Sequence, residues 1–352
     1  MAITIKDIAK VAGVSTSTVS YVINGTRTVT HEKRQRVLEV IAKTGYQPNT
    51  VAKSLRTKKT NTIGVLVEDI LAFPTSRIIN GISEYVEKTD YRILFSDLRM
   101  LDSLFNKYDQ IVHQKEKISK ELLFLVHGAK VDAIIYVGMF DRDISGVIGD
   151  INMPVVVAYS TSGDAHTNFV TYENEDISTQ IVDYLMELGH KRIAVITGLA
   201  HTAPAQLRLK GIHKAFNEAG MVLDSQLVKS GDWERNSGYS CMKELLENKG
   251  VALPTAVFVM NDLMAIGAMD AIMEAGLSVP NDISVVGFDN RDVSEFVFPK
   301  LTTAEIDLKA IGYAAAQMTI ETLAGKSQLA DKSKLIVPSK MILRDTVRRV
   351  DS

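Results

Sequence analysis

Residues 13–25, with the sequence GVSTSTVSYVING, are rich in side chains that both donate and accept hydrogen bonds. Six of these thirteen residues are Ser, Thr or Asn, and none is charged. Apolar residues recur among them at helical spacing: Val14, Val19, Val22 and Ile23. The pattern predicts a short helix whose exposed face carries hydroxyls and Tyr21. Small hydroxyl side chains allow close approach to base edges or phosphates, and the lack of acidic residues avoids repulsion by phosphates.

A second short helix is expected just before this segment. Thr4 precedes the sequence IKDIAKVA, and Asp7 follows three residues later as a weaker relative of a capping box. Gly13 then begins a tight turn, and Ser15 is a good N-cap for the next helix. Helix, glycine-containing turn and second short helix form the helix-turn-helix pattern, in which the second helix enters the major groove.

A third helix is predicted over residues 31–44, HEKRQRVLEVIAKT, with Thr30 as its cap and Gly45 at its end. Its apolar residues are expected to point inward: Val37, Leu38 and Ile41. Residues 1–60 contain eleven Lys and Arg but only three acids, a net charge of +8, whereas the remainder carries −10. A basic head on an acidic body indicates a polyanionic partner for the head, and charge alone equally fits a solvated surface.

Residues 46–60, YQPNTVAKSLRTKKT, follow the third helix. Pro48 breaks that helix, and Asn49 can cap a segment too short to be a stable helix by itself. Two interpretations stay open. The segment is either a flexible linker or a hinge that becomes helical only on DNA, with Leu55 as an apolar wedge between base steps.

The rest of the chain alternates strand-like apolar runs with amphipathic stretches. The expected strands are residues 62–67, 92–97, 133–138, 154–159, 192–198, 256–261 and 283–289. Nearly continuous Val and Ile runs followed by helices predict parallel sheets covered on both faces. So long an alternation fits two doubly wound lobes with a ligand cleft at the strand ends.

Several side chains suited to binding a sugar follow these strands. Asn261 and Asp289 each come directly after an apolar run, Arg208 is expected to open a helix, and Trp233 is the single tryptophan. Amide, carboxylate and guanidinium groups bind hydroxyls, and an aromatic face covers the apolar side of a sugar ring. For Asn261 or Asp289 alone, a helix cap or a structural hydrogen bond is the simpler interpretation.

The segments TIKDIAKVAGVSTSTVSYVING and GYQPNTVAKSLR resemble the DNA-binding head and hinge of the lactose-repressor (LacI/GalR) family. The resemblance implies three base-reading side chains: Thr16, Ser17 and Tyr21. It implies four that hold phosphates: Ser15, Thr18, Asn24 and Arg27. It also implies a minor-groove hinge that includes Asn49, Ala52, Lys53, Leu55 and Arg56, with Leu55 intercalating.

The resemblance continues through VMNDLMAIGAMDAIMEAGLSVPNDISVVGFDN. It implies a helix-turn-helix domain over residues 1–47, a hinge over 48–61 and a two-lobed effector and dimerisation domain over 62–352. The lobes would be of the periplasmic-binding-protein type, about 62–160 and 161–290, with the remainder crossing between both. The implied effector-binding residues are Ala72, Phe73, Pro74, Tyr159, Arg208, Trp233, Asn261 and Asp289.

Two features depart from the family pattern. Residues 97–132 lack the usual landmarks, and Ile306 stands where some members carry a polar ligand residue. Both leave the identity of the sugar open.

Other classes of protein are disfavoured by the sequence. No His pair has metal-ligand spacing, Cys241 is the only cysteine, and no glycine-rich phosphate loop occurs, so an enzyme, a metal and a cofactor are not expected. We expect no secretory signal and no membrane segment, hence a cytoplasmic protein and not a sugar-transport protein.

The sequence therefore predicts a dimeric transcription regulator, a repressor of carbohydrate genes. Its expected partners are a pseudo-palindromic double-stranded DNA operator, a small sugar or sugar phosphate as effector, and a second copy of the chain as a homodimer. The alternatives are control by a purine-like corepressor or by a protein partner.

Overall fold

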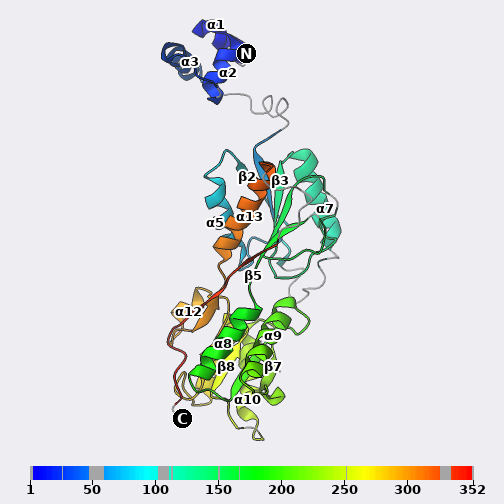
Figure 1. The fold of residues 1–352 in the computed structure, drawn as a ribbon, viewed down its shortest axis with the longest axis vertical. Coiled ribbons are helices and arrows are strands. Elements are labelled where there is room, and N and C mark those ends of the chain that lie inside the picture. Colours follow the sequence, from blue (N-terminus) through cyan, green and yellow to red (C-terminus); the bar gives the residue numbers. More distant parts are fainter. Residues whose placement is uncertain are drawn as a thin grey trace. The chain divides into compact units, whose positions relative to one another are not determined.

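The computed structural model describes residues 3–25, 27–46, 59–101, 111, 114–149, 151–165, 167–250, 252–325 and 334–350. The chain divides into two compact units, residues 1–60 and residues 61–352. In the part of the first unit, the head, that the structure describes, there are three helices (Figure 1): α1 (Ile5–Ala12), α2 (Thr16–Asn24) and α3 (His31–Thr44). The expected helix-turn-helix arrangement is therefore present.

Local sequence signals start and stop the first two helices. The Thr4 hydroxyl accepts from the Asp7 N–H, while the Asp7 carboxylate accepts from the Thr4 N–H at 2.9 Å, which completes a capping box. Gly13 ends α1 in the left-handed conformation, with a φ of 65° that favours glycine. The Ser15 hydroxyl then accepts from the Thr18 N–H at 3.1 Å and caps α2 as predicted.

Two expectations for α3 are wrong. Thr30 precedes the helix, but its side chain makes no capping hydrogen bond. Leu38 is 47% exposed, whereas Val37 is fully buried and Ile41 packs against the same small core. The buried stripe of α3 runs through positions 37, 40 and 41, and one residue turns the helix by about 100°, which carries position 38 off that stripe.

The second unit, the body, begins with a six-stranded parallel sheet in the order β11-β5-β4-β3-β1-β2. Its strands are β1 (Thr62–Val67), β2 (Arg92–Asp97), β3 (Ala133–Val137), β4 (Val155–Ala158), β5 (Asn168–Tyr172) and β11 (Lys334–Val337). Its helices are α5 (Thr75–Val86), α7 (Lys115–Leu123) with the π-helical turn η2 (Phe124–Gly128), and α13 (Leu308–Leu323). The first four strands were predicted, but β5 and β11 were not, so this sheet extends past the lobe boundary expected near residue 160.

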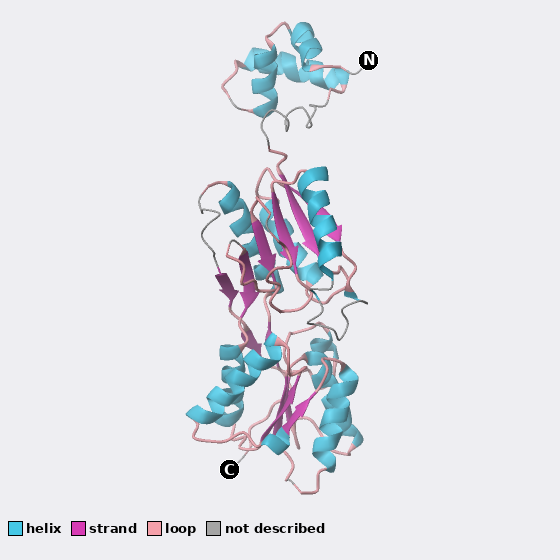
Figure 2. Ribbon diagram, turned by 90° about the vertical axis from the view of Figure 1, so that its right-hand side faces the viewer, coloured by secondary structure: helices cyan, strands magenta, loops and turns pink. Residues whose placement is uncertain are grey.

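A second parallel sheet has the order β7-β6-β8-β9. Its strands are β6 (Ile193–Thr197), β7 (Val228–Ser230), β8 (Ala256–Val259) and β9 (Ser284–Val286). The accompanying helices are α8 (Glu175–Glu187), α9 (Ala203–Glu218), η3 (Ser225–Leu227), α10 (Arg235–Glu247), α11 (Asp262–Glu274) and α12 (Val293–Phe296). Helices flank each sheet on both sides (Figure 2), and β3, β4, β6 and β8 are buried along their whole length. This burial explains their unbroken apolar sequences.

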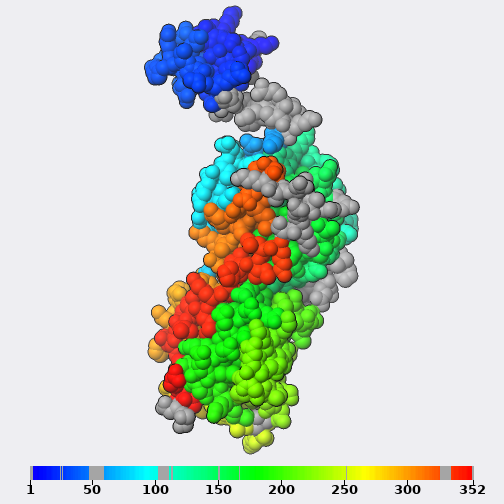
Figure 3. All heavy atoms as spheres, viewed as in Figure 1, coloured from blue at the N-terminus to red at the C-terminus, as the bar shows by residue number. Residues whose placement is uncertain are grey.

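The C-terminal part of the chain joins the two lobes. The strand β10 (Thr303–Glu305) pairs antiparallel with β12 (Lys340–Ile342), while α13 and β11 between them return to the first lobe. Figure 3 shows the red C-terminal segment along the surface of the body. On α13, a Cβ at Gly312 would lie 1.9 Å from the carbonyl oxygen of Ile78, so α13 and α5 pack backbone to backbone.

Among the described residues, no helix has the length and apolar character needed to cross a membrane. The same part of the chain holds no group of three His, Cys, Asp or Glu residues able to bind a metal ion.

Candidate ligand cavity and DNA-binding face

A cavity of about 540 Å³ lies in the body and is lined from both lobes, within the ~300–1,000 Å³ typical of ligand sites. Its walls are loops at the carboxyl ends of the parallel strands, where the chain turns toward the following helix. All eight residues expected to bind an effector line it: Ala72, Phe73, Pro74, Tyr159, Arg208, Trp233, Asn261 and Asp289. Asn261 and Asp289 were expected from their places after apolar runs, whereas Ala72, Phe73, Pro74 and Tyr159 were expected from the family resemblance alone.

Each of the three guanidinium nitrogen atoms of Arg208 donates a hydrogen bond. It is 2% exposed, and its Nε donates to Asn174 Oδ1 at 2.9 Å. Its Nη2 donates to the Tyr172 hydroxyl at 3.1 Å, and its Nη1 donates to the carbonyl of Met260. Because Tyr172 ends β5 of the first sheet and α9 belongs to the second lobe, this guanidinium connects the lobes.

The expected position of Arg208 in its helix was wrong. Helix α9 begins at Ala203, so Arg208 is its sixth residue and does not open it. Pro204 lies in the first helical turn, where its missing N–H costs nothing and its fixed φ suits the helix. The sequence APAQ (residues 203–206) thus belongs to the helix and is not part of the preceding loop.

Two acidic residues of the cavity, Asp141 and Asp289, are buried. Burial raises the pKa of Asp141 to about 6, although the Arg208 charge and the Asn174 amide oppose the rise. Burial also raises the pKa of Asp289, against the opposing charges of Arg291 and Arg208. Asp289 lies 3.4 Å from Arg291 Nε and 3.9 Å from Arg208 Nη2. These carboxyls can accept hydrogen bonds from hydroxyl or N–H groups of a ligand.

Neighbouring residues determine the position of the Trp233 indole. A Cβ at residue 198 would lie 2.0 Å from Trp233 Cζ2, so only Gly198 allows the indole to occupy this place. Asn261 Nδ2 donates to the Trp233 carbonyl at 2.8 Å, and Asn261 Oδ1 caps α11 by accepting from the Met264 N–H at 2.8 Å. The helix-cap interpretation of Asn261 is therefore correct, and its amide also fixes the loop that carries the indole.

Three residues around the cavity adopt backbone conformations that L-residues rarely take. The φ angles of Tyr159, Trp233 and Asp289 are 66°, 75° and 110°. Such conformations cost on the order of 1–3 kcal/mol each and cluster at ligand sites, because surrounding structure holds them. Each follows a strand, so the strain aims these three side chains at the cavity.

Cavity residues that were not predicted include Asp141, Arg142, Tyr172 and Arg291. Asp141 and Arg142 follow the predicted strand 133–138, so the rule that found Asn261 could have found them. Tyr172 ends a strand that was not predicted. Arg291 places its guanidinium carbon 4.1 Å from the Phe73 ring centroid, a cation–π contact between the lobes that has no signal in the sequence.

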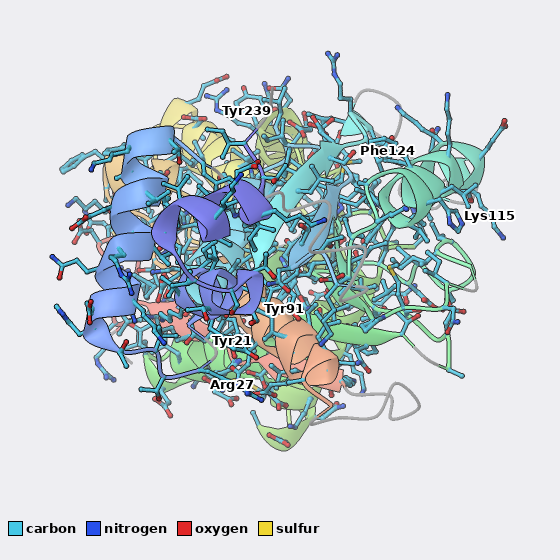
Figure 4. All side chains as sticks on the ribbon, turned by 90° about the horizontal axis from the view of Figure 1, so that it is seen from above. Tyr21, Arg27, Tyr91, Lys115, Phe124 and Tyr239 are labelled. Atoms are coloured by element: carbon cyan, nitrogen blue, oxygen red, sulfur yellow. The ribbon has the colours of Figure 1, made fainter. Side chains whose placement is uncertain are left out.

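In the head, α2 presents the hydroxyl face that its sequence predicted. Thr16 and Ser17 are exposed, and Tyr21 is half-buried. The Arg27 guanidinium lies over the Tyr21 ring, 5.2 Å from its centroid, and the two residues are labelled side by side in Figure 4. Ser15 is exposed, but its hydroxyl is engaged with the hydroxyls of Ser17 and Thr18 at 2.7 and 2.8 Å. The Asn24 side chain and the hinge residues Asn49, Ala52, Lys53, Leu55 and Arg56 lie outside the described residues.

Comparisons with known proteins agree with both halves of this geometry. Residues 4–49 match the bacterial regulatory proteins of the lacI family, and residues 182–347 match a periplasmic binding protein-like domain. The HTH-type transcriptional repressor PurR of Pasteurella multocida (strain Pm70) is 33% identical over 347 residues, covering 98% of each chain. The chain belongs to the lacI family of bacterial regulatory proteins.

Solved structures of two transcriptional regulators share the architecture of the chain. The lac repressor dimer bound to operator and the anti-inducer ONPF has a TM-score of 0.77 and 28% identity, covering 99% of this chain and all of that one. The transcriptional regulator CelR in complex with cellobiose has a TM-score of 0.66 and 25% identity, covering 98% of this chain and 99% of that one. The predicted fold class, a helix-turn-helix head with two parallel-sheet lobes, is confirmed. As a lacI-family member the chain is a DNA-binding transcriptional repressor.

Proposed function

We propose that this lacI-family repressor binds a pseudo-palindromic operator as a homodimer and that a small molecule in the cavity between its lobes controls the affinity. The observation that carries the proposal is the cavity itself, where buried Arg208 of α9 meets Trp233 and Asp289, which both have strained backbones and follow strands. A ligand that contacts both lobes stabilises one arrangement of the lobes relative to another. Such coupling is typically worth ~1–3 kcal/mol.

Carbohydrates are the ligand class that these side chains suit best. The lining carries four carboxyls and three guanidinium groups: Asp141, Asp143, Glu234, Asp289, Arg142, Arg208 and Arg291. Each sugar hydroxyl both donates and accepts, so interleaved acceptors and donors match it, while the Trp233 face covers an apolar ring face. The structural similarity to a cellobiose-bound regulator supports this choice.

A purine-like corepressor is the second candidate. It is favoured by the relatives named PurR, which are 30–33% identical over nearly the whole chain. A planar base would stack on the Trp233 indole and use the same donors and acceptors. The two classes differ in outcome, because a corepressor strengthens operator binding whereas we expect a sugar to release the operator.

Calorimetry with a panel of mono- and disaccharides, sugar phosphates, purine bases and nucleosides tests the ligand class. The binder should quench or shift the emission of Trp233, the only tryptophan in the chain. Asp289→Asn should weaken it at least about tenfold through the lost acceptor, whereas Asp282→Asn, at an exposed position outside the cavity, should not. A binder whose affinity survives Asp289→Asn and leaves the emission unchanged would place the effector elsewhere.

A further inference from the structure

Unpaired donor groups gather at the cavity. In the described part of the chain, five buried side-chain atoms have no hydrogen-bond partner, and three of them belong to cavity residues: Nε and Nη1 of Arg142 and Nε1 of Trp233. Arg142 is only 8% exposed. A guanidinium stays charged at any pH the protein meets, so both nitrogen atoms always present donors. A ligand oxygen that reaches these nitrogen atoms would satisfy groups that the chain leaves unpaired.

The remaining arm of Arg142 is committed to the first lobe. Its Nη2 donates to Oε2 of the fully buried Glu68 at 2.7 Å. Glu68 also accepts from the Tyr136 hydroxyl at 2.6 Å and from the Met139 N–H at 2.9 Å. The Phe140 ring centroid lies 5.4 Å from the guanidinium carbon. Arg142 is thus held in place, and its positive charge is already balanced before any ligand arrives.

The charge next to Arg142 disfavours an anion. Asp141 and Asp143 flank it in the chain and line the same cavity, and Glu68 lies behind it. The buried carboxyls of Glu68 and Asp141 and the exposed carboxyl of Asp143 therefore surround Arg142, while Arg208 is a second guanidinium whose charge acts on Asp141. A phosphate at Arg142 would meet excess negative charge in a partly buried site, where repulsion is stronger than in water. An uncharged oxygen avoids this repulsion, and a hydroxyl can also donate its proton to a neighbouring carboxylate.

We propose that Arg142 binds an uncharged oxygen of the effector and that, with Asp141, it selects a neutral polyhydroxylated ligand over the phosphate ester of that ligand. The proposal rests on the proposed function, ligand control from this cavity, and narrows its ligand class. Trp233 Nε1, on the second lobe, would meet another acceptor of the same molecule, so the ligand would be recognised from both lobes.

Calorimetry tests the selection directly. Each neutral sugar of the panel is measured beside its phosphate ester, and purine nucleosides beside their monophosphates. We expect the tightest compound to be uncharged and its phosphate ester to bind at least about tenfold more weakly, because the ester brings a charge against the carboxyls. A phosphate ester that binds more tightly than its parent compound overturns the proposal.

The role of Arg142 is tested by measuring how tightly variants bind the tightest compound of that panel. Arg142→Lys keeps the charge that pairs with Glu68 but loses the fixed donor geometry, so affinity should fall about 10- to 100-fold. Arg235→Lys, a matched change at an exposed arginine outside the cavity, should leave affinity unchanged. The double variant Arg142→Met/Glu68→Gln removes both buried charges together and should show the same loss if the single variant folds poorly.

Different results would exclude the role of Arg142 and the role of the cavity as the effector site. If a compound binds, quenches Trp233 and needs Asp289, but binds Arg142→Lys and the double variant as tightly as the wild type, this proposal is wrong and the proposed function stands. If no compound binds, or the binder ignores Asp289 as well, the cavity is not the effector site and both proposals fall together.

Discussion

At the scale of single residues, the cavity depends on residues that position the side chains around them. Gly198 is one of them, because a Cβ there would lie 2.0 Å from Trp233 Cζ2. Asn261 is another, since its amide holds the Trp233 carbonyl. The indole is therefore placed by its surroundings, and small changes there should alter ligand binding without touching the ligand.

Gly198→Ala tests this placement. The added methyl must push the indole aside, so we expect ligand affinity to fall by about tenfold or more, with a shifted Trp233 emission in the ligand-free protein. Gly250→Ala is the control, because its Cβ would meet only the Asn248 side chain at 3.5 Å. Unchanged emission and unchanged affinity in Gly198→Ala would contradict the packing described here.

Asp141 gives stability a dependence on pH. Burial raises its pKa from the ordinary 3.8 to about 6, so between these values the folded state keeps a proton that the unfolded state has released. The contribution of this carboxyl to stability therefore declines as the pH rises through this window and stays lost above it. Asp141→Asn has no such loss, so its unfolding free energy relative to wild type should increase by up to about 3 kcal/mol as the pH is raised from about 4 to 7.

Urea unfolding at several pH values measures this difference. Asp90→Asn, at an exposed position, is the matched control and should track the wild type. A wild-type-minus-Asp141→Asn difference that stays constant with pH, or that moves in the opposite direction, would falsify the assignment of a buried, proton-retaining carboxyl at this position.

At the scale of elements, what the sequence could predict followed from local patterns. Strands β1 and β2 begin and end at the predicted residues, because their apolar runs are flanked by clear turn signals. Strand β11 was not predicted. It lies at the edge of the sheet, and its apolar residues Leu335 and Ile336 are 41% and 46% exposed. Leu38 of α3 is likewise an apolar residue that is exposed, because it does not lie on the buried stripe of the helix.

Part of the site could be predicted from polar residues that follow apolar runs. Polar residues after apolar runs located Asn261 and Asp289, and the same rule would have found Arg142. The positive φ angles of Tyr159 and Trp233 have no counterpart in residue type, because the strain is imposed by packing. The contacts of Arg208 with Asn174 and Tyr172 link segments more than thirty residues apart, which periodicity does not detect.

Helix α2 makes a prediction about base preference. Tyr21 and Thr16 occupy positions expected to read bases, so Tyr21→Ala or Thr16→Ala should change which bases are preferred. Arg27→Ala should weaken binding to all sequences alike through a lost phosphate contact. Because the Arg27 guanidinium lies over the Tyr21 ring, the effects of Tyr21→Ala and Arg27→Ala should not be additive. Selection from random duplexes decides this, and unchanged preference in both the Tyr21 and Thr16 variants would remove these residues from base reading.

At the scale of the whole molecule, the contrast between head and body predicts the salt dependence of DNA binding. Residues 1–60 carry a net charge of +8 in a chain whose total is −2. A dimer that neutralises about six to ten phosphates should give a slope of log K against log salt of roughly −5 to −9. Fluorescence anisotropy with a labelled operator measures the slope, and a value near zero on the best site would exclude binding driven by these charges.

The body is held in its present arrangement by contacts between the lobes. Arg208 reaches Tyr172, Arg291 lies 4.1 Å from the centroid of the Phe73 ring, and Arg77 forms an ion pair with Asp292. Arg208, Tyr172, Arg291 and Phe73 all line the cavity, so a ligand must share or replace their contacts. A ligand can shift the balance between lobe arrangements only by the difference in its affinity for them.

Control of DNA affinity by a ligand in this cavity is tested by measuring operator binding with and without the ligand. The dissociation constant for the operator is determined by anisotropy with and without a saturating amount of the tightest compound found by calorimetry, for the wild type and for Asp289→Asn. We predict that the compound changes the wild-type constant by about 5- to 150-fold and that the same concentration leaves the Asp289→Asn constant nearly unchanged. A compound that fills the cavity of the wild type yet leaves its operator affinity the same would contradict the account.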